Sequence, residues 1–408
     1  MKFLFVHQNF PAQYQHLIAH LHERGGHDIV FISEANQNTM AGVRRVLYQT
    51  KPPTLEGFHP AAHDLERGVR RAELVANAAR TLKRLGYQPD IIIGHHGWGE
   101  MLDLIDVFPD VPMLGYYEFY YHSDGQDVDF DPEFPFDPAG LPRIRSMNVI
   151  NHLAHAMGRA GQTPTQWQHE RYPDWMRPAI DVLPEGARLD LCKPDPAARR
   201  RPFAIDSFRV APGEKLLTFV ARNLEPYRGV HTMIRALPAL MRERRDLKVV
   251  MVGGDDVSYG APCPKGTWRD HFLKEIAGQY DPARLLMPGQ IPYELYLRML
   301  QRSDVHVYLT YPFVASWSLR EALASGCAVI GAEVDPVREF ITHNRTGLLT
   351  PCLDPGLLTE NVLTLLDNTK LADKLRAGAR RHAEKHLDMK LHLASFARKI
   401  HAMTGQKI

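Results

Sequence analysis

The chain has 408 residues, a hydrophobic content of 44% and a net charge of +2, from 49 Lys and Arg against 47 Asp and Glu. This length exceeds that of a single-core domain and predicts two domains, and the balanced charge argues against binding to nucleic acid. No apolar run approaches the roughly 20 residues of a membrane-spanning helix, although peripheral contact with a membrane stays open. The four cysteines show no paired or metal-site spacing, so we expect reduced thiols and a cytoplasmic location.

The first half of the chain alternates strand patterns with helical patterns. Strands are predicted at residues 2–6, 28–32, 91–94, 113–117 and 180–183, and helices at residues 14–24, 61–85 and 142–158. Strands separated by helices are typical of parallel βαβ units. Residues 1–192 therefore predict one doubly wound domain.

A segment rich in proline and arginine, residues 193–212, predicts a linker, and its Arg199-Arg200-Arg201 run is interpreted as a solvated surface. Residues 213–386 then repeat the α/β pattern. The predicted strands are 216–221, 248–253, 285–287, 305–309 and 328–331, and the helices are 230–244, 268–280, 293–301, one from near Ser316, and 355–385 with a break near Asn368.

The last helix, predicted at residues 389–403 within the segment 387–408, is expected to cross back to the first domain. The fold class is therefore α/β, with two Rossmann-like, doubly wound domains facing each other across a cleft. Such a cleft is the usual place for a ligand.

Two arginines frame the first strand–helix junction of the second domain. Arg222 closes a predicted strand and Arg228 lies just before the next helix. Guanidinium groups stay charged and bind phosphate oxygens in pairs, so the two residues are candidates for a diphosphate clamp. The alternative is a pair of surface salt bridges.

A second candidate segment links the strand at 305–309 to a helix. The N–H groups of Ser316, Trp317 and Ser318 lie at the predicted helix start, where an anion is stabilised. Glu321 follows one turn later, and a carboxylate there suits the paired hydroxyls of a ribose. The segment thus predicts a site for a phosphate with a sugar beside it.

These motifs, together with Gly253-Gly254-Asp255 and the run from Pro288 to Pro292, resemble the C-terminal half of family-4 glycosyltransferases, which are retaining, nucleotide-sugar-dependent enzymes of the GT-B fold. The resemblance implies that Arg222 and Arg228 bind the donor diphosphate and that Glu321 binds the ribose. It also places Gly254, Gln290 and Ile291 in the donor site, the last two beside the base.

One position departs from the family pattern. The paired-glutamate motif has its first Glu eight residues before the second, and Phe313 stands there in this chain. That Glu normally touches hydroxyls of the donor sugar. Trp317 or Ser318 is then expected to line the sugar pocket, and the identity of the sugar stays open.

The N-terminal half resembles the same superfamily more loosely, through a subgroup that shares its first loop (residues 7–11), Gly97-Trp98-Gly99-Glu100 and residues 117–120. Glu118 stands near the place where many relatives carry a His. A carboxylate there can orient the acceptor or stabilise positive charge at the anomeric carbon. His96, on the neighbouring strand end, is the second catalytic candidate. The alternative is a structural carboxylate for Glu118 and a loop histidine for each of His95 and His96.

An acidic loop between residues 124 and 137 admits a metal interpretation, because hard oxygen ligands gather there; they are Asp127, Asp129, Asp131 and Glu133. The two arginines already supply the positive charge that a metal would provide. We therefore expect no metal and no cofactor, and interpret this loop as part of the acceptor site or as solvated. His152 and His155 are interpreted as core residues, and Trp167 and Trp175 as acceptor-stacking or packing residues.

The resemblance implies transfer of a glycosyl group from a nucleotide diphosphate sugar to a hydroxyl acceptor with retention. The acceptor is expected to be a glycan, a polysaccharide precursor or a small molecule. In the mechanism favoured for the family the leaving phosphate takes the acceptor's proton, so no protein base is needed. Two alternatives stay open: a nucleotide-sugar epimerase or inverting GT-B enzyme with Glu118 as base, and a non-catalytic nucleotide-sugar-binding protein.

Overall fold

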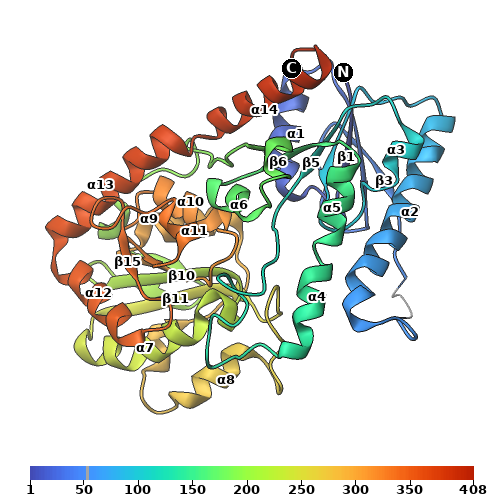
Figure 1. Ribbon diagram of the computed structural model, residues 1–408. Helices are drawn as coiled ribbons and strands as arrows, with labels where there is room; N and C mark the ends of the chain where they lie inside the picture. The colour runs from blue at the N-terminus through green and yellow to red at the C-terminus, as the bar shows by residue number, and fades with distance from the viewer. Residues whose placement is uncertain (52–54) are drawn as a thin grey trace. The chain divides into compact units, whose positions relative to one another are not determined.

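The computed structural model describes residues 1–51 and 55–408, which divide into two compact units. Unit 1 holds Met1–Glu185 and Met389–Ile408, and unit 2 holds Gly186–Asp388. Each unit has its own parallel sheet with helices packed on it (Figure 1). Among the described residues no helix combines the length and the apolar character needed to cross a membrane.

Unit 1 is built on a parallel sheet of seven strands in the order β3-β2-β1-β4-β5-β6-β7. The strands are β1 (Lys2–Val6), β2 (Asp28–Ser33), β3 (Val43–Leu47), β4 (Ile91–His95), β5 (Met113–Tyr116), β6 (Ala160–Thr163) and β7 (Ile180–Val182). The helices are α1 (Gln15–Arg24), α2 (His63–Arg84), α3 (Leu104–Val107), α4 (Leu141–Ser146), α5 (Val149–Ala156), α6 (Gln166–Arg171) and α14 (Met389–Thr404).

Side chains alternate between the two faces of this sheet, and both faces are buried. Phe3 and Phe5 of β1 pack in one core with Phe396 of α14, whereas Leu4 and Val6 pack in the other. The final helix, α14, lies beside α1 in unit 1 (Figure 1). The continuous apolar run Phe3–Val6 of β1 can therefore be recognised in the sequence, because each of these residues is buried.

Unit 2 repeats the plan with six parallel strands in the order β12-β11-β10-β13-β14-β15. The strands are β10 (Lys215–Asn223), β11 (Leu247–Gly254), β12 (Leu285–Leu286), β13 (Val305–Tyr308), β14 (Val329–Ala332) and β15 (Leu348–Thr350). The helices are α7 (Val230–Glu243), α8 (Trp268–Glu275), α9 (Tyr293–Arg302), α10 (Trp317–Ala324), α11 (Asp335–Arg338), α12 (Pro355–Asp367) and α13 (Thr369–His386). The break expected near Asn368 is confirmed, since its side chain caps α13 by accepting from the N–H of Leu371 at 3.0 Å.

Four features differ from the sequence predictions. Three short strands, β3, β6 and β15, were not predicted, because their few residues show too little alternation or carry charges such as Arg44. The predicted helix 142–158 is two helices, α4 and α5, with a break at Met147 and Asn148. The predicted helix 268–280 ends early as α8, ahead of Gly278.

The fourth difference concerns residues 193–212, where the sequence predicts a linker. They contain a 3₁₀ turn, η5 (Ala198–Arg200), and an antiparallel hairpin of β8 (Phe203–Ile205) and β9 (Phe208–Val210). Phe203, Ile205 and Val210 are buried in unit 2. Prolines suggested a linker, but the apolar side chains between them anchor the segment.

In both sheets the strand order reverses beside the first strand of the unit, between β1 and β4 and between β10 and β13. Ligands of open parallel sheets bind outside the carboxyl ends of the strands at such a point. Functional side chains are therefore expected on the loops that follow β1, β4, β10 and β13.

Candidate active site

In unit 2 the segment after β10 holds Arg228 in a buried position. It ends the 3₁₀ turn η6 (Pro226–Arg228), and the next residue, Gly229, caps the start of α7 at φ +68°, where a Cβ atom would lie 2.4 Å from Leu309. Arg228 Nη1 donates to Thr310 Oγ1 at 3.0 Å and to the Val314 carbonyl at 3.3 Å. Over the described ranges, no carboxylate forms an ion pair with this guanidinium. A buried cation held by neutral oxygens is suited to receive an anion.

Arg222 occupies an exposed position on the same sheet edge. The register between β10 and β11 shifts between Val220 and Asn223, so Arg222 lies in an irregular stretch at the end of its strand. Within residues 1–51 and 55–408 it has no ion-pair partner. Both members of the expected clamp thus lie at the carboxyl end of β10, one held in place and one exposed.

Two residues that sequence reasoning did not assign shape the neighbouring loop. The buried Glu225 carboxylate accepts from the backbone N–H groups of Ser258 and Gly260, at 3.1 and 3.2 Å. Asn223 Nδ2 donates to Ser258 Oγ at 2.7 Å, and a Cβ atom at Gly254 would lie 2.6 Å from Asn223 Oδ1. Gly254 therefore permits the close approach of the two strand ends. The sequence signal for Glu225 was its place as an acidic residue inside the Arg222–Arg228 motif.

The start of α10 corrects one expectation. The Ser316 N–H, expected to face a phosphate, already donates to the Tyr308 hydroxyl at 2.8 Å. The hydroxyls of Ser316 and Ser318 are 2.6 Å apart, and Trp317 is half-buried as the first residue of α10. The helix start is therefore available through its later N–H groups and the serine hydroxyls rather than through Ser316 N–H.

Glu321, one turn into α10, is oriented by two phenols that the sequence did not single out. Tyr293 donates to Oε1 at 2.6 Å and Tyr296 donates to Oε2 at 2.9 Å. Burial raises the pKa of the Glu321 carboxyl, and the two phenols and Arg320 oppose that rise. Each carboxylate oxygen keeps further acceptor capacity. The spacing of Tyr293 and Tyr296 at the start of α9, three residues apart, was the signal for this pair.

We expect Glu321→Gln to weaken binding of a free nucleoside diphosphate by ten- to a hundred-fold, because a charge-assisted hydrogen bond to ribose contributes about 1.5–3 kcal/mol. Isothermal titration calorimetry measures this, and the preference for a ribo- over a 2′,3′-dideoxynucleotide should shrink in parallel. Tyr296→Phe is the control, because it removes an orienting phenol and keeps the carboxylate. Unchanged nucleotide affinity in Glu321→Gln would make the carboxylate structural.

The remaining donor candidates lie in the loop between β12 and α9. Gly253 N–H donates to the Gly289 carbonyl at 3.1 Å, which ties this loop to the end of β11. Gln290 is exposed and Ile291 is half-buried. Gly253 and Gly254 thus lie on the same edge as the segment that carries Gln290 and Ile291.

Phe313, at the position of the missing glutamate, is buried in an aromatic cluster. Its ring centroid lies 5.3 Å from that of Tyr227 and 4.6 Å from that of Tyr259, and the Arg228 guanidinium lies 5.1 Å from the Tyr259 ring. The position of the family's carboxylate is therefore taken by an apolar ring, which contacts the Tyr259 ring that lies next to Arg228.

In unit 1 the carboxyl ends of β4 and β5 bring Glu118 to His95. The distance from His95 Nε2 to Glu118 Oε2 is 3.2 Å, and the Glu118 side chain is 33% exposed, which leaves it reachable by a substrate. Gly97 N–H donates to His95 Nδ1 at 3.0 Å, so the ring proton lies on Nε2 and points at Glu118. His95 was weighed in the sequence only as a loop residue.

His96, the expected partner, points the other way. Its ring is buried over Gly115, where a Cβ atom would lie 1.8 Å from the ring, and its centroid lies 4.9 Å from that of the tilted Tyr117 ring. Burial, helped by the charges of His95 and Arg159, lowers the pKa of His96 to about 3. Adjacent residues at a strand end face opposite sides of the sheet, which is why His95 and not His96 meets Glu118.

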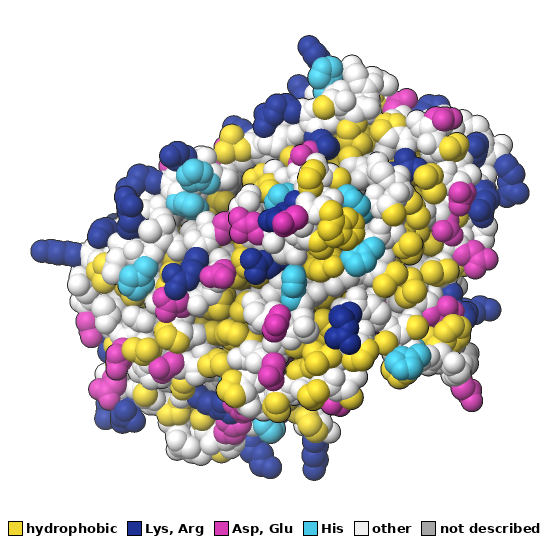
Figure 2. Space-filling model, in the orientation of Figure 1, with side chains coloured by type: hydrophobic (Ala, Val, Ile, Leu, Met, Phe, Trp, Pro, Cys, Tyr) yellow, Lys and Arg dark blue, Asp and Glu magenta, His cyan; other side chains and the backbone are white. Residues whose placement is uncertain are grey.

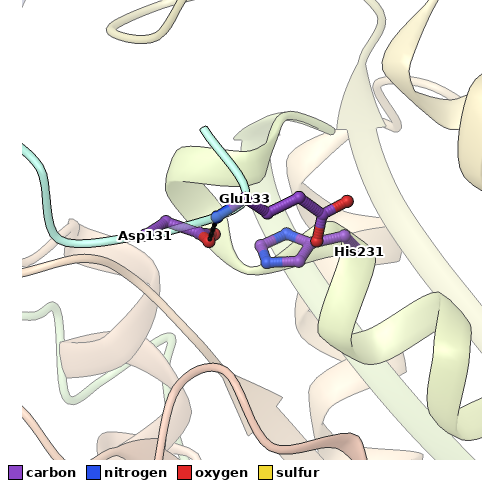
Figure 3. A group of neighbouring side chains, drawn as sticks. All are labelled: Asp131, Glu133 and His231. Atoms are coloured by element: carbon purple, nitrogen blue, oxygen red, sulfur yellow. Dashed lines mark hydrogen bonds between the residues drawn. The ribbon is translucent and has the colours of Figure 1, made fainter. Parts of the chain in front are cut away.

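Two carboxylates of the acidic loop in unit 1 accept hydrogen bonds from the backbone of the same loop. Asp131 Oδ1 accepts from the Glu133 N–H at 2.9 Å (Figure 3), and Asp129 accepts from the Phe136 N–H at 3.2 Å. Such side-chain-to-backbone bonds are typical of loops. These bonds account for some of the carboxylates that suggested a metal site during sequence analysis.

An aromatic and histidine-rich surface lies over α5. Trp175 is 56% exposed and contacts His152 and His155, with ring centroids 5.4 and 5.0 Å apart, whereas Trp167 is buried. His152 and His155 are both half-buried, so the core interpretation is wrong for each, and His152 Nε2 lies 2.9 Å from the Tyr120 hydroxyl. Figure 2 shows hydrophobic side chains with histidines beside them where Figure 1 draws α5.

Two family models match consecutive parts of the chain. Residues 25–192 match the model described as Glycosyl transferase family 4 group, and residues 202–382 match the model described as Glycosyl transferases group 1. Together they span most of both units.

Curated relatives share lower identity over part of the chain. The D-inositol 3-phosphate glycosyltransferase of Jonesia denitrificans is 27% identical over 212 residues, which cover 50% of this chain and 47% of the relative. The phosphatidyl-myo-inositol mannosyltransferase of Mycobacterium leprae is 25% identical, covering 40% of this chain and 41% of the relative. The chain thus spans about half the length of the curated relatives it matches.

Solved structures match over nearly the whole chain and show the fold. Sucrose-phosphate synthase from Thermosynechococcus elongatus has a TM-score of 0.73 and 16% identity, with 99% of both chains covered. Anabaena HepE in complex with UDP-glucose has a TM-score of 0.67 and 17% identity, covering 98% of this chain and 100% of that chain. Both likenesses agree with two Rossmann-like units.

Proposed function

Since this chain belongs to the family-4 glycosyltransferases of the GT-B fold, we propose that it transfers a glycosyl group from a nucleotide diphosphate sugar to a hydroxyl acceptor with retention of configuration. The acceptor class we propose is a glycan, a polysaccharide precursor or a small molecule, and the location is the cytoplasm. The proposal assigns the donor to unit 2 and the acceptor to unit 1.

The observation that carries the proposal is the state of Arg228. Its guanidinium is buried, its hydrogen bonds go to the neutral oxygens of Thr310 and Val314, and no carboxylate among the described residues neutralises it. A diphosphate leaving group provides the missing negative charge. Arg222 on the same edge and the start of α10 add to this positive environment.

The chemistry follows from where charge develops. The bond between the anomeric carbon and the diphosphate oxygen breaks, a bond to the acceptor oxygen forms, and the acceptor proton passes to the leaving diphosphate. Arg222 and Arg228 stabilise the charge that grows on that diphosphate. Glu118, oriented by His95, holds the acceptor hydroxyl or stabilises positive charge at the anomeric carbon.

Similar proteins guide the choice of donor. HepE is solved with UDP-glucose, and the curated relatives are named as glycosyltransferases. UDP-glucose is therefore the first donor to test, followed by other nucleotide sugars ranked by the rise that each produces in the unfolding midpoint.

We expect the chain to release the nucleoside diphosphate from a donor that it binds, and to form an acceptor product with the donor's anomeric configuration. Coupled nucleotide release measures turnover, and the proton NMR coupling of the product gives its anomer. EDTA should leave the rate unchanged, because arginines rather than a metal are proposed to neutralise the diphosphate. Loss of activity in EDTA with recovery in Mn²⁺ would contradict the metal-free proposal.

Two alternatives are an epimerase or inverting enzyme and a non-catalytic nucleotide-sugar-binding protein. One observation favours each, and the same assay separates them. The Glu118–His95 pair could serve as a base, which would give an inverted product or an epimerised sugar. Phe313 in its aromatic cluster favours a protein that binds the nucleotide sugar without turnover. A bound donor with neither hydrolysis nor transfer would support that second alternative.

A further inference from the structure

Unit 2 contains a cavity of about 380 Å³ away from the start of α10. It is lined by four arginines, Arg199, Arg376, Arg380 and Arg381, and by Ser325 directly after α10. The eight residues of α10 span roughly 12 Å, so this cavity lies at the opposite end of the helix from Ser316–Ser318. It is therefore distinct from the proposed donor site.

The guanidinium groups of two of these arginines are held in place by hydrogen bonds. Arg376 donates to Asp373 Oδ1 at 2.8 Å and to the Asp304 carbonyl at 2.5 Å. Arg380 donates to the carbonyls of Cys192 and Ala324, each at 2.8 Å. These bonds hold both guanidiniums in place without displacing them from the cavity lining.

The other two arginines keep guanidinium N–H donors available for a ligand. Among the residues that the structure describes, Arg199 has only a 3.7 Å ion pair with Asp373, which Arg376 also engages, and exposed Arg381 has no hydrogen bond. Burial lowers the pKa of Arg199, and the positive charge of Arg376 lowers it further. Like charges that are gathered but incompletely neutralised stabilise a bound anion.

Neutral and acidic groups in the lining agree with an anion site. The Ser325 hydroxyl is buried and, among the described residues, has no hydrogen-bond partner. Of the two lining carboxylates, Asp373 is shared between Arg199 and Arg376, and Asp195 is already paired with Arg201 and accepts from the Ala197 N–H at 2.9 Å. The cavity thus offers guanidinium donors and a hydroxyl, with its carboxylates occupied.

We propose that this cavity binds the phosphate group of a small phosphate ester. Arg199 and Arg381 supply paired N–H donors to the phosphate oxygens, with the Ser325 hydroxyl as a further donor. The volume leaves room beyond a phosphate for a body the size of a monosaccharide. The Arg199-Arg200-Arg201 run, interpreted from sequence as solvated, thereby acquires one residue with a binding role.

Calorimetry on the full chain tests this with glucose 6-phosphate and inorganic phosphate as probes. Saturable binding of the ester is expected, at least tenfold tighter than that of inorganic phosphate, since only the ester fills the cavity. Arg199→Gln and Arg381→Gln should each weaken the ester by at least tenfold. Arg200→Gln, at an exposed neighbour that does not line the cavity, is the matched control and should bind as wild type.

The donor-site variant Arg222→Ala separates the two sites, because it should bind glucose 6-phosphate with wild-type affinity. Arg381 is exposed, so its variant is expected to fold even if Arg199→Gln does not. Three results would overturn the proposal: no saturable binding of the ester up to about 10 mM, equal affinity for inorganic phosphate and the ester, or unchanged ester affinity in both Arg199→Gln and Arg381→Gln.

Discussion

Arg228→Ala is expected to lower kcat/KM for glycosyl transfer by about 10²–10³-fold, which corresponds to a loss of about 2.7–4 kcal/mol of transition-state stabilisation. The reason is that Arg228 is a buried cation positioned by Thr310 and Val314, and the diphosphate charge grows as the glycosyl bond breaks. Arg222→Ala should fall in the same range if both arginines clamp the diphosphate. Steady-state kinetics with the best-binding nucleotide sugar measures both.

Controls separate this effect from misfolding. Arg228→Lys keeps the charge and should lose less activity, and Arg242→Ala removes an exposed arginine of α7 that pairs with Glu243 and should have no effect. Thermal unfolding of each variant checks that the fold persists. Near-wild-type kcat/KM in both Arg222→Ala and Arg228→Ala would mean that the donor site has been misplaced.

Glu118→Gln is expected to lower kcat by about 10²-fold while leaving nucleotide affinity unchanged. The carboxylate charge is lost but the shape is kept, and every residue proposed to bind the nucleotide belongs to unit 2. The product anomer should stay the same, because retention is proposed to come from attack and departure on one face. Single-turnover kinetics, nucleotide calorimetry and NMR of the product measure the three quantities.

His95 and His96 provide a matched pair for this experiment. His95→Gln should lower kcat in the same direction, because it removes the donor that orients Glu118, whereas His96→Asn should change stability more than kcat, because that ring is buried over Gly115. Wild-type kcat in Glu118→Gln would return that carboxylate to a structural role. An inverted product from the wild-type protein would make Glu118 a candidate general base.

The fold was largely predictable because both sheets are covered on both faces. Strands such as β1 are then continuous apolar runs, which stand out in any sequence. The break at Asn368 was visible for a similarly local reason, since a capping side chain contacts its own helix start. Short strands such as β3 and β15 were not visible, because their pairing rather than their composition makes them strands.

The same distinction between local features and long-range contacts applies to the candidate site. Placing Arg222 and Arg228 beside the end of a strand needed only their positions along the chain. The partners of Glu321 and Glu118 were less accessible, because Tyr293 and Tyr296 are 28 and 25 residues from Glu321, and His95 is 23 residues from Glu118. Backbone hydrogen bonds such as that from Ser316 N–H to the Tyr308 hydroxyl depend on loop geometry, which the spacing of residues along the chain does not encode.

The sequence by itself determined the two α/β halves, the family resemblance and the charged groups at the strand ends, because these follow from local periodicity and residue type. Only the tertiary structure decided that His95 rather than His96 meets Glu118, that Arg228 is a buried cation without a carboxylate partner among the described residues, and that Arg199 lines a cavity. Those outcomes depend on which side of a strand a side chain faces and on which distant segments pack around it. Contacts between residues far apart in the chain set both.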